Sequence, residues 1–304
     1  AGINVITKSG TNKWKGSAYT FRRTESMNGA RVGDDKLPAQ LDQTNTIIGG
    51  TVGGALIKNK LFVFLSAEFE NQDRPGILFS PTGGSGRGNV SATPIDSLRR
   101  LSNFLRERYN YETGVFDEFP NFKVENRKIL ARIDWNINKM HKLSARYQEM
   151  VGYNDVTINA TSVPTNPSFI PPGTTSARTN LPNARFGLQS MSFANSIYGF
   201  DNIVRSGTIE LNSNKAGKWS NQLLGTFSTV RTTRSTPSAI FPIIDIFNNN
   251  TNNYMSVGYE PFSFNNDVKN NVFSITNNFK IYKGKHTLTL GGTYEQQYVG
   301  NMFM

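Results

Sequence analysis

Residues 49–70 read GGTVGGALIKNKLFVFLSAEFE and carry the clearest structural pattern in this chain. From Leu61 onward apolar side chains occupy every second position, and successive strand residues point to opposite faces of a sheet. The apolar positions are Leu61, Val63, Leu65, Ala67 and Phe69, and the alternate positions are Phe62, Phe64, Ser66, Glu68 and Glu70. A barrel strand crosses a bilayer with about 9–11 residues, whereas a soluble strand usually has about 5–6. This stretch therefore predicts a transmembrane barrel strand whose second face begins aromatic and becomes acidic.

The segment just before this strand is rich in glycine, at Gly49, Gly50, Gly53 and Gly54. Glycine inside a strand removes side chains where another group approaches the backbone closely. We therefore expect a barrel wall with something packed against its inner side.

The composition permits a barrel and excludes several other classes. The chain has 304 residues, no cysteine and a mean hydropathy of −0.43, and no apolar run comes near the roughly 18 residues of a transmembrane helix. A transmembrane barrel keeps its hydropathy low because apolar and polar positions alternate. The lack of cysteine excludes disulfide frameworks and thiolate metal sites. Because the chain begins at Ala1 and stops inside a strand-like run, we expect it to be a piece of a longer protein.

The net charge is +11, from 33 Lys and Arg against 22 Asp and Glu. In a soluble domain this excess would suggest a nucleic-acid partner. The basic residues are instead dispersed among strand ends and turns, without a dense cluster. A solvated, unevenly charged surface explains this arrangement better, and we expect no nucleic-acid partner.

Nine segments carry strand patterns, and their connections alternate in length. The expected strands are residues 16–24, 44–54, 61–70, 127–137, 142–150, 202–212, 220–231, 271–281 and 286 onward. The long connections are 25–43, 71–125, 152–199 and 232–270, and the tight ones lie near residues 57, 139, 216 and 284. Outer-membrane barrels have short periplasmic turns and long extracellular loops. The pattern predicts an all-β fold, an antiparallel transmembrane β-barrel wall of about nine strands with long extracellular loops.

One long connection contains a helical pattern at residues 95–109, IDSLRRLSNFLRERY. Ile95, Leu98, Leu101 and Leu105 fall on one apolar stripe of this helix. Two interpretations stay open: an ordinary loop helix packed on the barrel rim, or a lid or partner-binding element.

Several motifs resemble TonB-dependent outer-membrane transporters, most of all the Oar-like branch that carries a carboxypeptidase-regulatory-like domain. Residues 2–12, GINVITKSGTN, are similar to the end of the plug domain, and residues 16–19, GSAY, resemble the first barrel strand. Residues 49–64 resemble the second hairpin, with Ala55 where the family more often has Pro. Two further short motifs match recurrent barrel-strand segments of the family, Arg132-Ile133-Asp134 and Gly284-Lys285-His286-Thr287-Leu288. The loops resemble nothing in the family.

The resemblance implies a specific organisation and specific partners. Family barrels have about 22 strands around a plug, so residues 1–13 would be the C-terminal end of the plug and residues 14–304 the N-terminal part of the barrel. The implied function is energy-coupled uptake of a large or scarce ligand across the bacterial outer membrane. The implied partners are the TonB-ExbB-ExbD complex, acting through a segment outside this sequence, outer-membrane lipid, and a surface lipoprotein above the barrel.

A set of charged residues shares the parity expected for the barrel lumen. These lumen-facing candidates are Glu68, Glu70, Arg132, Asp134, Arg146, Glu210 and Glu295. They either pair with each other and with the plug in a wet interior, or they line a substrate path. The glycine run at residues 84–88 lacks the strand–turn–helix setting of a phosphate loop, and we expect a flexible loop there. No catalytic, cofactor or metal motif is present, so we expect neither an enzyme nor a bound cofactor.

Two other function classes compete with active import. A passive porin-like barrel or a surface-binding structural barrel would show the same strand pattern, and an upstream plug with a TonB-contacting segment would distinguish import from both. A soluble basic β-protein that binds nucleic acid would need aromatic and basic residues clustered on one sheet face. The sequence shows no such cluster.

Overall fold

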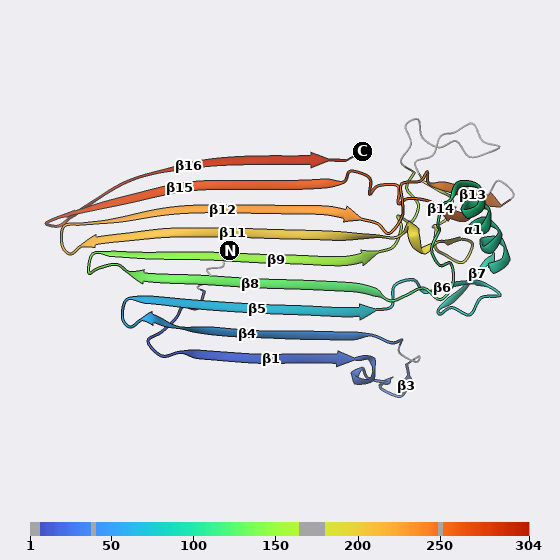
Figure 1. Ribbon diagram of the computed structural model, residues 1–304, viewed down its shortest axis with the longest axis horizontal. Helices are drawn as coiled ribbons and strands as arrows, with labels where there is room; N and C mark the ends of the chain where they lie inside the picture. The colour runs from blue at the N-terminus through green and yellow to red at the C-terminus, as the bar shows by residue number, and fades with distance from the viewer. Residues whose placement is uncertain (1–6, 38–40, 164–179, 249–251, 304) are drawn as a thin grey trace.

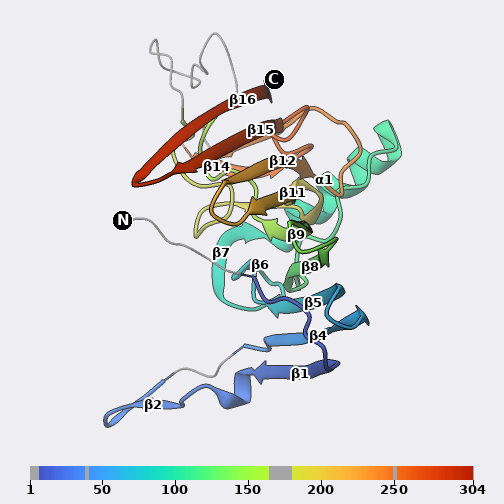
Figure 2. The same ribbon diagram turned by 90° about the vertical axis from the view of Figure 1, so that its left-hand side faces the viewer.

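A computed structural model of the protein describes residues 7–37, 41–163, 180–248 and 252–303. Its main element is one antiparallel sheet of nine strands, in the order β1-β4-β5-β8-β9-β11-β12-β15-β16 (Figure 1). The strands are β1 (Lys15–Thr24), β4 (Thr44–Ile57), β5 (Leu61–Arg74), β8 (Phe122–Asn136), β9 (His141–Val156), β11 (Tyr198–Lys215), β12 (Trp219–Ser235), β15 (Asp267–Lys283) and β16 (His286–Met302). Each strand pairs with the next one in the sheet, so the chain runs up and down. Figure 2, viewed from the end with the tight turns, shows these strands as one layer from β1 to β16.

The nine predicted strands and the four tight turns between them are confirmed. The strands are longer than predicted, mainly at the end with the long connections: β5 continues to Arg74, β8 already begins at Phe122, and β9 continues to Val156. These extensions stay paired, for example Asp73 with Lys123. In the β5 extension, residues 71–74, the side chains are polar on both faces, so the apolar alternation that reveals a strand is lost although the backbone ladder continues. The β8 and β9 extensions keep apolar side chains such as Val124 and Tyr153, but charged residues and Gly152 interrupt the alternation. Residues 1–6, part of the segment that resembles the end of a plug, lie outside the described residues.

The two faces of the sheet differ in polarity. The register pairs the apolar positions of β5 with apolar positions of the neighbouring strands, so these side chains lie on one face. One row pairs Val63 with Ile133, Ile133 with Ala145, Ala145 with Ile209 and, two strands further, Gly225 with Ile275. We call the side of this row the apolar face and the opposite side the polar face. Large hydrophobic side chains such as Ile209 remain 60% exposed on the apolar face. An exposed apolar surface of this extent is typical of contact with lipid or another apolar partner.

The long connections contain short structural elements besides the predicted helix. All of them leave the sheet at the same end, opposite the tight turns (Figure 1), and three of them share further secondary structure. The elements are β6 (Phe79–Thr82), β7 (Asn89–Pro94), α1 (Ile95–Tyr109), β10 (Met191–Ser192), β13 (Ile244–Asn248) and β14 (Asn252–Val257). Strands β10, β14 and β13 form one small sheet although they belong to two different connections. We call this assembly the cap. The first long connection carries only η1 (Glu25–Met27) and the short hairpin of β2 (Arg31–Val32) and β3 (Asp35–Lys36).

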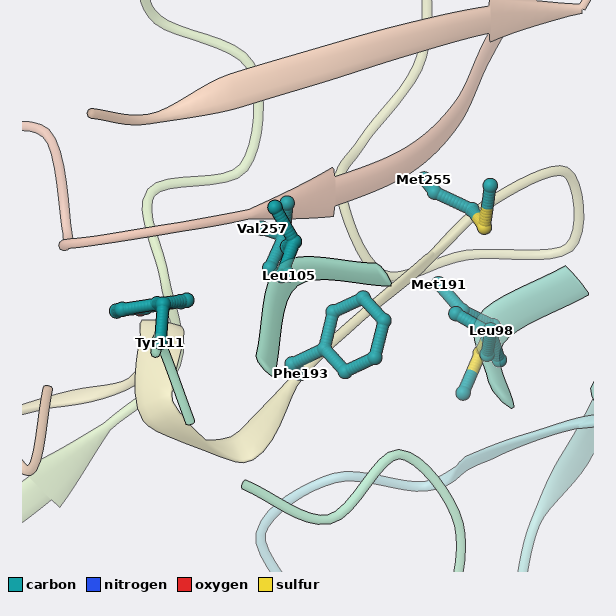
Figure 3. Close-up of a cluster of buried hydrophobic side chains, with 7 residues drawn as sticks. All are labelled: Leu98, Leu105, Tyr111, Met191, Phe193, Met255 and Val257. Atoms are coloured by element: carbon teal, nitrogen blue, oxygen red, sulfur yellow. The ribbon is translucent and has the colours of Figure 1, made fainter. Parts of the chain in front are cut away.

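The cap has its own hydrophobic core, to which the predicted helix contributes. The core consists of Leu98, Leu105, Tyr111, Met191, Phe193, Met255 and Val257, which approach one another from three connections (Figure 3). Helix α1 has the predicted bounds, and Asn110 ends it in the left-handed conformation at φ 51°. Burial raises the pKa of the Tyr111 hydroxyl, which lies 2.6 Å from Ser238 Oγ. No helix among the described residues is long and apolar enough to span a membrane. The helix is thus a structural part of the cap.

An ion pair with a fully buried arginine joins two of these connections. Arg185 has no exposed side-chain surface, and its Nε and Nη2 lie 2.9 Å from the two carboxylate oxygens of Asp245. Its Nη1 donates to the backbone carbonyls of Asn159 at 2.8 Å and Ser162 at 3.1 Å. Ser256 Oγ donates to Asp245 as well. Every group around this guanidinium is therefore satisfied, which a buried charge requires.

We predict that Arg185→Met destabilises the cap by about 3–5 kcal/mol, because it leaves the Asp245 carboxylate buried without its partner. Hydrogen exchange of the full-length protein should show faster exchange in β13 and β14 and unchanged exchange in the long strands. The matched control is Arg99→Met, since Arg99 pairs with Asp96 on the exposed side of α1 and such pairs contribute at most about 1 kcal/mol. Equal exchange in the two variants would contradict the structural role of the buried pair.

The difference between the two faces predicts an asymmetric response to charge. Val63→Arg on the apolar face should cost about 2–4 kcal/mol if that face contacts the bilayer interior. Ser66→Arg places the same charge on the polar face of the same strand and should cost much less. The measurement is the yield of folded, heat-modifiable protein in outer-membrane fractions. Equal losses for both variants would rule out lipid on the apolar face.

Candidate functional site

The strand register brings all the predicted lumen residues to the polar face. Glu68 and Glu70 lie on β5, Arg132 and Asp134 on β8, Arg146 on β9, Glu210 on β11 and Glu295 on β16. They do not form one cluster, because they are spread over most of the width of the sheet. Glu295 stands apart from the rest on the edge strand, opposite Ser274.

The two glutamates of β5 are bound by neighbouring wall residues. Tyr19 Oη donates to Glu68 Oε2 at 2.7 Å, and Lys128 Nζ lies 2.8 Å from Glu68 Oε1. The carboxylate oxygens of Glu70 accept from the side-chain amides of Asn45 at 3.2 Å and Asn126 at 3.1 Å. Both carboxylates are thus satisfied within the wall, which agrees with a wet interior whose charges pair with each other.

The glycines of β4 make room for aromatic rings that cross the strand. A Cβ on Gly49 would lie 2.4 Å from the ring of Tyr19 on the polar face. On the apolar face a Cβ on Gly54 would lie 2.2 Å from the indole of Trp14. The close approach predicted from glycine therefore exists on both faces, and the approaching groups include side chains of the wall itself.

The N-terminal segment, residues 7–12, lies against the polar face. Arg132 forms a bidentate pair with Asp134, with both distances at 2.9 Å, and its Nη1 donates to Thr7 at the backbone oxygen (3.0 Å) and at Oγ1 (2.8 Å). Arg146 also donates to Thr7 Oγ1, over 3.5 Å. Further along, a Cβ on Gly10 would lie 2.5 Å from the carbonyl oxygen of Val63. The segment therefore packs directly on the wall.

The same segment ends at the tight turn between β4 and β5. Asn12 Nδ2 lies 2.5 Å from Asn59 Oδ1, and the backbone N–H of Asn59 donates to Asn12 Oδ1 at 2.7 Å. Asn59 adopts the left-handed conformation at φ 62°, which asparagine tolerates better than most residues. This turn therefore presents its backbone to the N-terminal segment.

Glu210 has spare hydrogen-bonding capacity on the polar face. Asn212 Nδ2 and Gln222 Nε2 both donate to its Oε1, at 2.9 and 2.7 Å. Arg146 lies on the neighbouring strand β9, where it pairs with Thr208, and Glu210 pairs with Ser144. Arg146 and Glu210 are therefore offset by two residues along the strands, on the same face. Of the predicted residues, Arg146 and Glu210 thus form the part of the wall best able to bind another polar group.

The cap contains a polar pocket of about 320 Å³ near the start of β6. Its lining includes Arg87, Glu118, Phe119 and Asn121. The glycine run at residues 84–88 borders it, and the backbone N–H groups of residues 85 and 86 donate to the two carboxylate oxygens of Asp117, at 2.7 and 2.9 Å. The amides that a phosphate loop would offer are therefore occupied by an internal carboxylate. Within the described ranges no three His, Asp or Glu side chains come close enough to hold a metal ion.

Sequence reasoning missed a charged cluster on the apolar face. Arg127, Glu149 and Arg205 lie on three adjacent strands, and Glu149 bridges the two arginines at 2.7 Å each. The alternation could have placed these residues on the apolar face, because Arg127 is two residues from Ile129 and Glu149 is two residues from Tyr147. The buried pair of Arg185 and Asp245 was missed as well, since nothing in the sequence relates two loop residues so far apart.

Comparisons with known proteins agree with this architecture. Residues 6–113 match a family model described as an outer membrane beta barrel domain. Comparison with curated protein sequences gave no match. Among solved structures, the chain is similar to the outer membrane transporter YddB from Escherichia coli, with a TM-score of 0.52 and 8% identity over 95% of this chain. The siderophore receptor PirA from Acinetobacter baumannii gives a TM-score of 0.46 and 11% identity over 97% of this chain.

The chain spans 31% of the length of each of these two structures. At this identity the similarity to YddB is one of fold. Together with the matched domain and the nine-stranded sheet, it shows that this chain forms an antiparallel β-barrel wall and indicates the bacterial outer membrane as its location.

Proposed function

We propose that this chain is part of the wall of a TonB-dependent outer-membrane transporter of the Oar-like branch, which imports a large or scarce ligand. The observation that carries the proposal is the packing of residues 7–12 on the polar face, through Arg132 and Thr7. A barrel with a chain segment bound to its inner wall needs an energy input to open a path. An empty porin-like barrel needs none.

In this proposal residues 1–13 are the end of a plug domain and residues 14–304 are barrel wall. The wall charges mostly bind one another, as Glu68 binds Tyr19 and Lys128. The described hydrogen bonds between the plug end and the lumen face come from Arg132 and Arg146, and each bond to a charged group contributes about 1.5–3 kcal/mol. Force on the plug could therefore release the segment while the wall keeps its own pairing.

The partners follow from the same proposal. The TonB-ExbB-ExbD complex would act on a plug segment outside this sequence, outer-membrane lipid would cover the apolar face, and a surface lipoprotein would close over the cap. We propose no nucleic-acid partner and no enzymatic reaction. The polar pocket beside Arg87 is the part of the cap best suited to first contact with a ligand, because pockets of about 300 Å³ or more hold small molecules.

A surface-binding barrel without import is the second candidate. The packed core of the cap favours it, because a cap built on Leu98, Phe193 and Val257 is a rigid surface rather than a set of independent loops. The two candidates differ in whether the N-terminal segment moves on the wall.

We predict that the N-terminal segment detaches when the inner-membrane complex is energised. Because the chain contains no cysteine, the pair Asn12→Cys and Asn59→Cys in the full-length protein can report its position through a short thiol cross-linker. The cross-linking yield in cells should fall when TonB-ExbB-ExbD is present and should recover when the proton-motive force is dissipated.

The matched control is the pair Asn59→Cys and Asn136→Cys, since Asn136 Nδ2 donates to the backbone oxygen of Asn59 within the wall at 3.0 Å. Its yield should not depend on the complex. A yield for Asn12 and Asn59 that is the same in energised and de-energised cells would contradict coupled import and would favour the surface-binding barrel.

We also predict that the cap is exposed to the medium and the tight turns face the periplasm. Cysteines at Ser85 in the cap and Asn138 in a tight turn, placed one at a time in the full-length protein, should react differently with an impermeant thiol reagent in intact cells. Only the cap position should react, and both should react after the cells are opened. Labelling of the turn position alone in intact cells would reverse the topology.

A further inference from the structure

The apolar face contains a groove of about 370 Å³ across the middle strands of the sheet. Its floor is made of small residues, Ala131, Ala145 and Gly225, and its sides include Ile133, Tyr147 and Phe227. The ring of Phe227 lies over Gly207, where a Cβ would be 2.2 Å from it. A row of small residues between large ones therefore leaves a hollow in this part of the apolar face.

The missed charged cluster lies next to this groove, on the side of the cap. Glu149 pairs with Arg205 in register, two residues beyond the pair of Tyr147 and Gly207, which is about 7 Å along the strand. Tyr147, a groove residue, donates its hydroxyl to Glu149 Oε2 at 3.3 Å. The apolar hollow and the charged cluster are therefore parts of one continuous surface.

The cluster carries a net positive charge that faces outward. Arg127 Nη2 and Arg205 Nε each lie 2.7 Å from one oxygen of Glu149, and the two arginine side chains remain 47% and 44% exposed. Each guanidinium has five N–H donors, and one from each is used in these ion pairs. The two guanidiniums are paired with only one carboxylate, so they have one uncompensated positive charge and free N–H donors with which to bind a second anion.

We propose that the groove and the two arginines bind one phosphorylated glycolipid of the outer leaflet, the lipid A type. One acyl chain lies in the groove and a phosphate lies on Arg127 and Arg205. The position of the site selects this occupant: the apolar face meets hydrocarbon, and the cap side is the extracellular side of a barrel with this loop pattern. A lipid of that leaflet offers an acyl chain and a phosphate at adjacent depths. Glu149 is a positioning residue that holds the two guanidiniums side by side.

A second ion pair on the same face provides a comparison. Arg231 on β12 binds Asp267 through its Nε and its Nη2, the latter at 2.6 Å, and is 50% exposed. There Lys269 lies opposite Arg231 in the ladder and lines a second hollow of about 370 Å³, so this group also carries two basic residues against one carboxylate. It lacks the carboxylate bridge that holds two guanidiniums side by side, but its charge is the same, so a charge control must lie outside the apolar face.

The test uses the purified full-length protein and native mass spectrometry, with bis-phosphorylated lipid A, dephosphorylated lipid A and phosphatidylglycerol as probes. We expect one bound lipid A, and about tenfold weaker binding of the dephosphorylated form and of the double variant with Arg127→Gln and Arg205→Gln. Gly225→Leu should also weaken binding, because a Cβ there meets only one atom within 4 Å, at 3.9 Å, and a leucine can fill the hollow. Arg99→Gln, on the exposed side of α1 in the cap, is the control for the loss of one arginine and should bind as the unaltered protein does.

The fold of each variant is checked independently by its heat-modifiable mobility, so loss of binding is distinguished from loss of structure. Equal binding of phosphorylated and dephosphorylated lipid A would overturn the proposal, as would an equal loss of binding in Arg99→Gln. Phosphatidylglycerol bound as tightly as lipid A would overturn the assigned lipid. A stable dimer that excludes lipid from Gly225 would show that a second copy occupies the face instead.

Discussion

The structure depends on one constraint, the shared register of nine antiparallel strands. Side chains alternate with a period of two, so a slip of one residue in any pair would move Glu68 or Arg132 to the apolar face and Val63 or Ile133 to the polar one. In hydrocarbon every backbone N–H and C=O must also be paired. Register thus fixes both the lipid surface and the polar interior at once, and the bridged pair of Tyr19 and Glu68 is possible only because Gly49 opposes each of them in the ladder.

The polar face joins this constraint to the proposed function. Its carboxylates at Glu68 and Glu70 are satisfied by wall residues, so the wall does not need the N-terminal segment to remain intact. Arg132 differs, because it binds Asp134 with one edge of its guanidinium and Thr7 with the remaining amino group. One residue therefore joins a pair within the wall and a contact with the N-terminal segment, which is the arrangement that the proposed release of a plug would use.

The sequence was sufficient wherever periodicity carries the structure. The helix α1 was predicted from apolar residues three and four positions apart. The nine strands, and the common face of the seven charged candidates, were predicted from alternation at every second position. The extension of β9 to Val156 was missed because Glu149 and Gly152 interrupt the apolar alternation that Val151 and Tyr153 continue. Periodicity is also silent on contacts between distant loops. The pairing of β10 with β14 and the bond of Arg185 to Asp245 depend on three connections meeting at one end of the sheet.

The cap and the wall are stabilised by different interactions, so they tolerate different substitutions. Wall residues are held by backbone pairing and face either the apolar or the polar side of the sheet. A substitution there must therefore match the polarity of the face to which the residue points. Cap positions such as Phe193 and Met255 are tied by side-chain packing between connections, so a change in one connection alters the fit of the others. The pocket beside Arg87 differs from the core, because its lining residues all belong to one connection, residues 75–121, and it meets the shared core through Phe79 and Phe119. Substitutions in this pocket can therefore leave the other connections and the strands beneath as they are. Under the proposed function, ligand choice would then be a property of the cap and release a property of the wall.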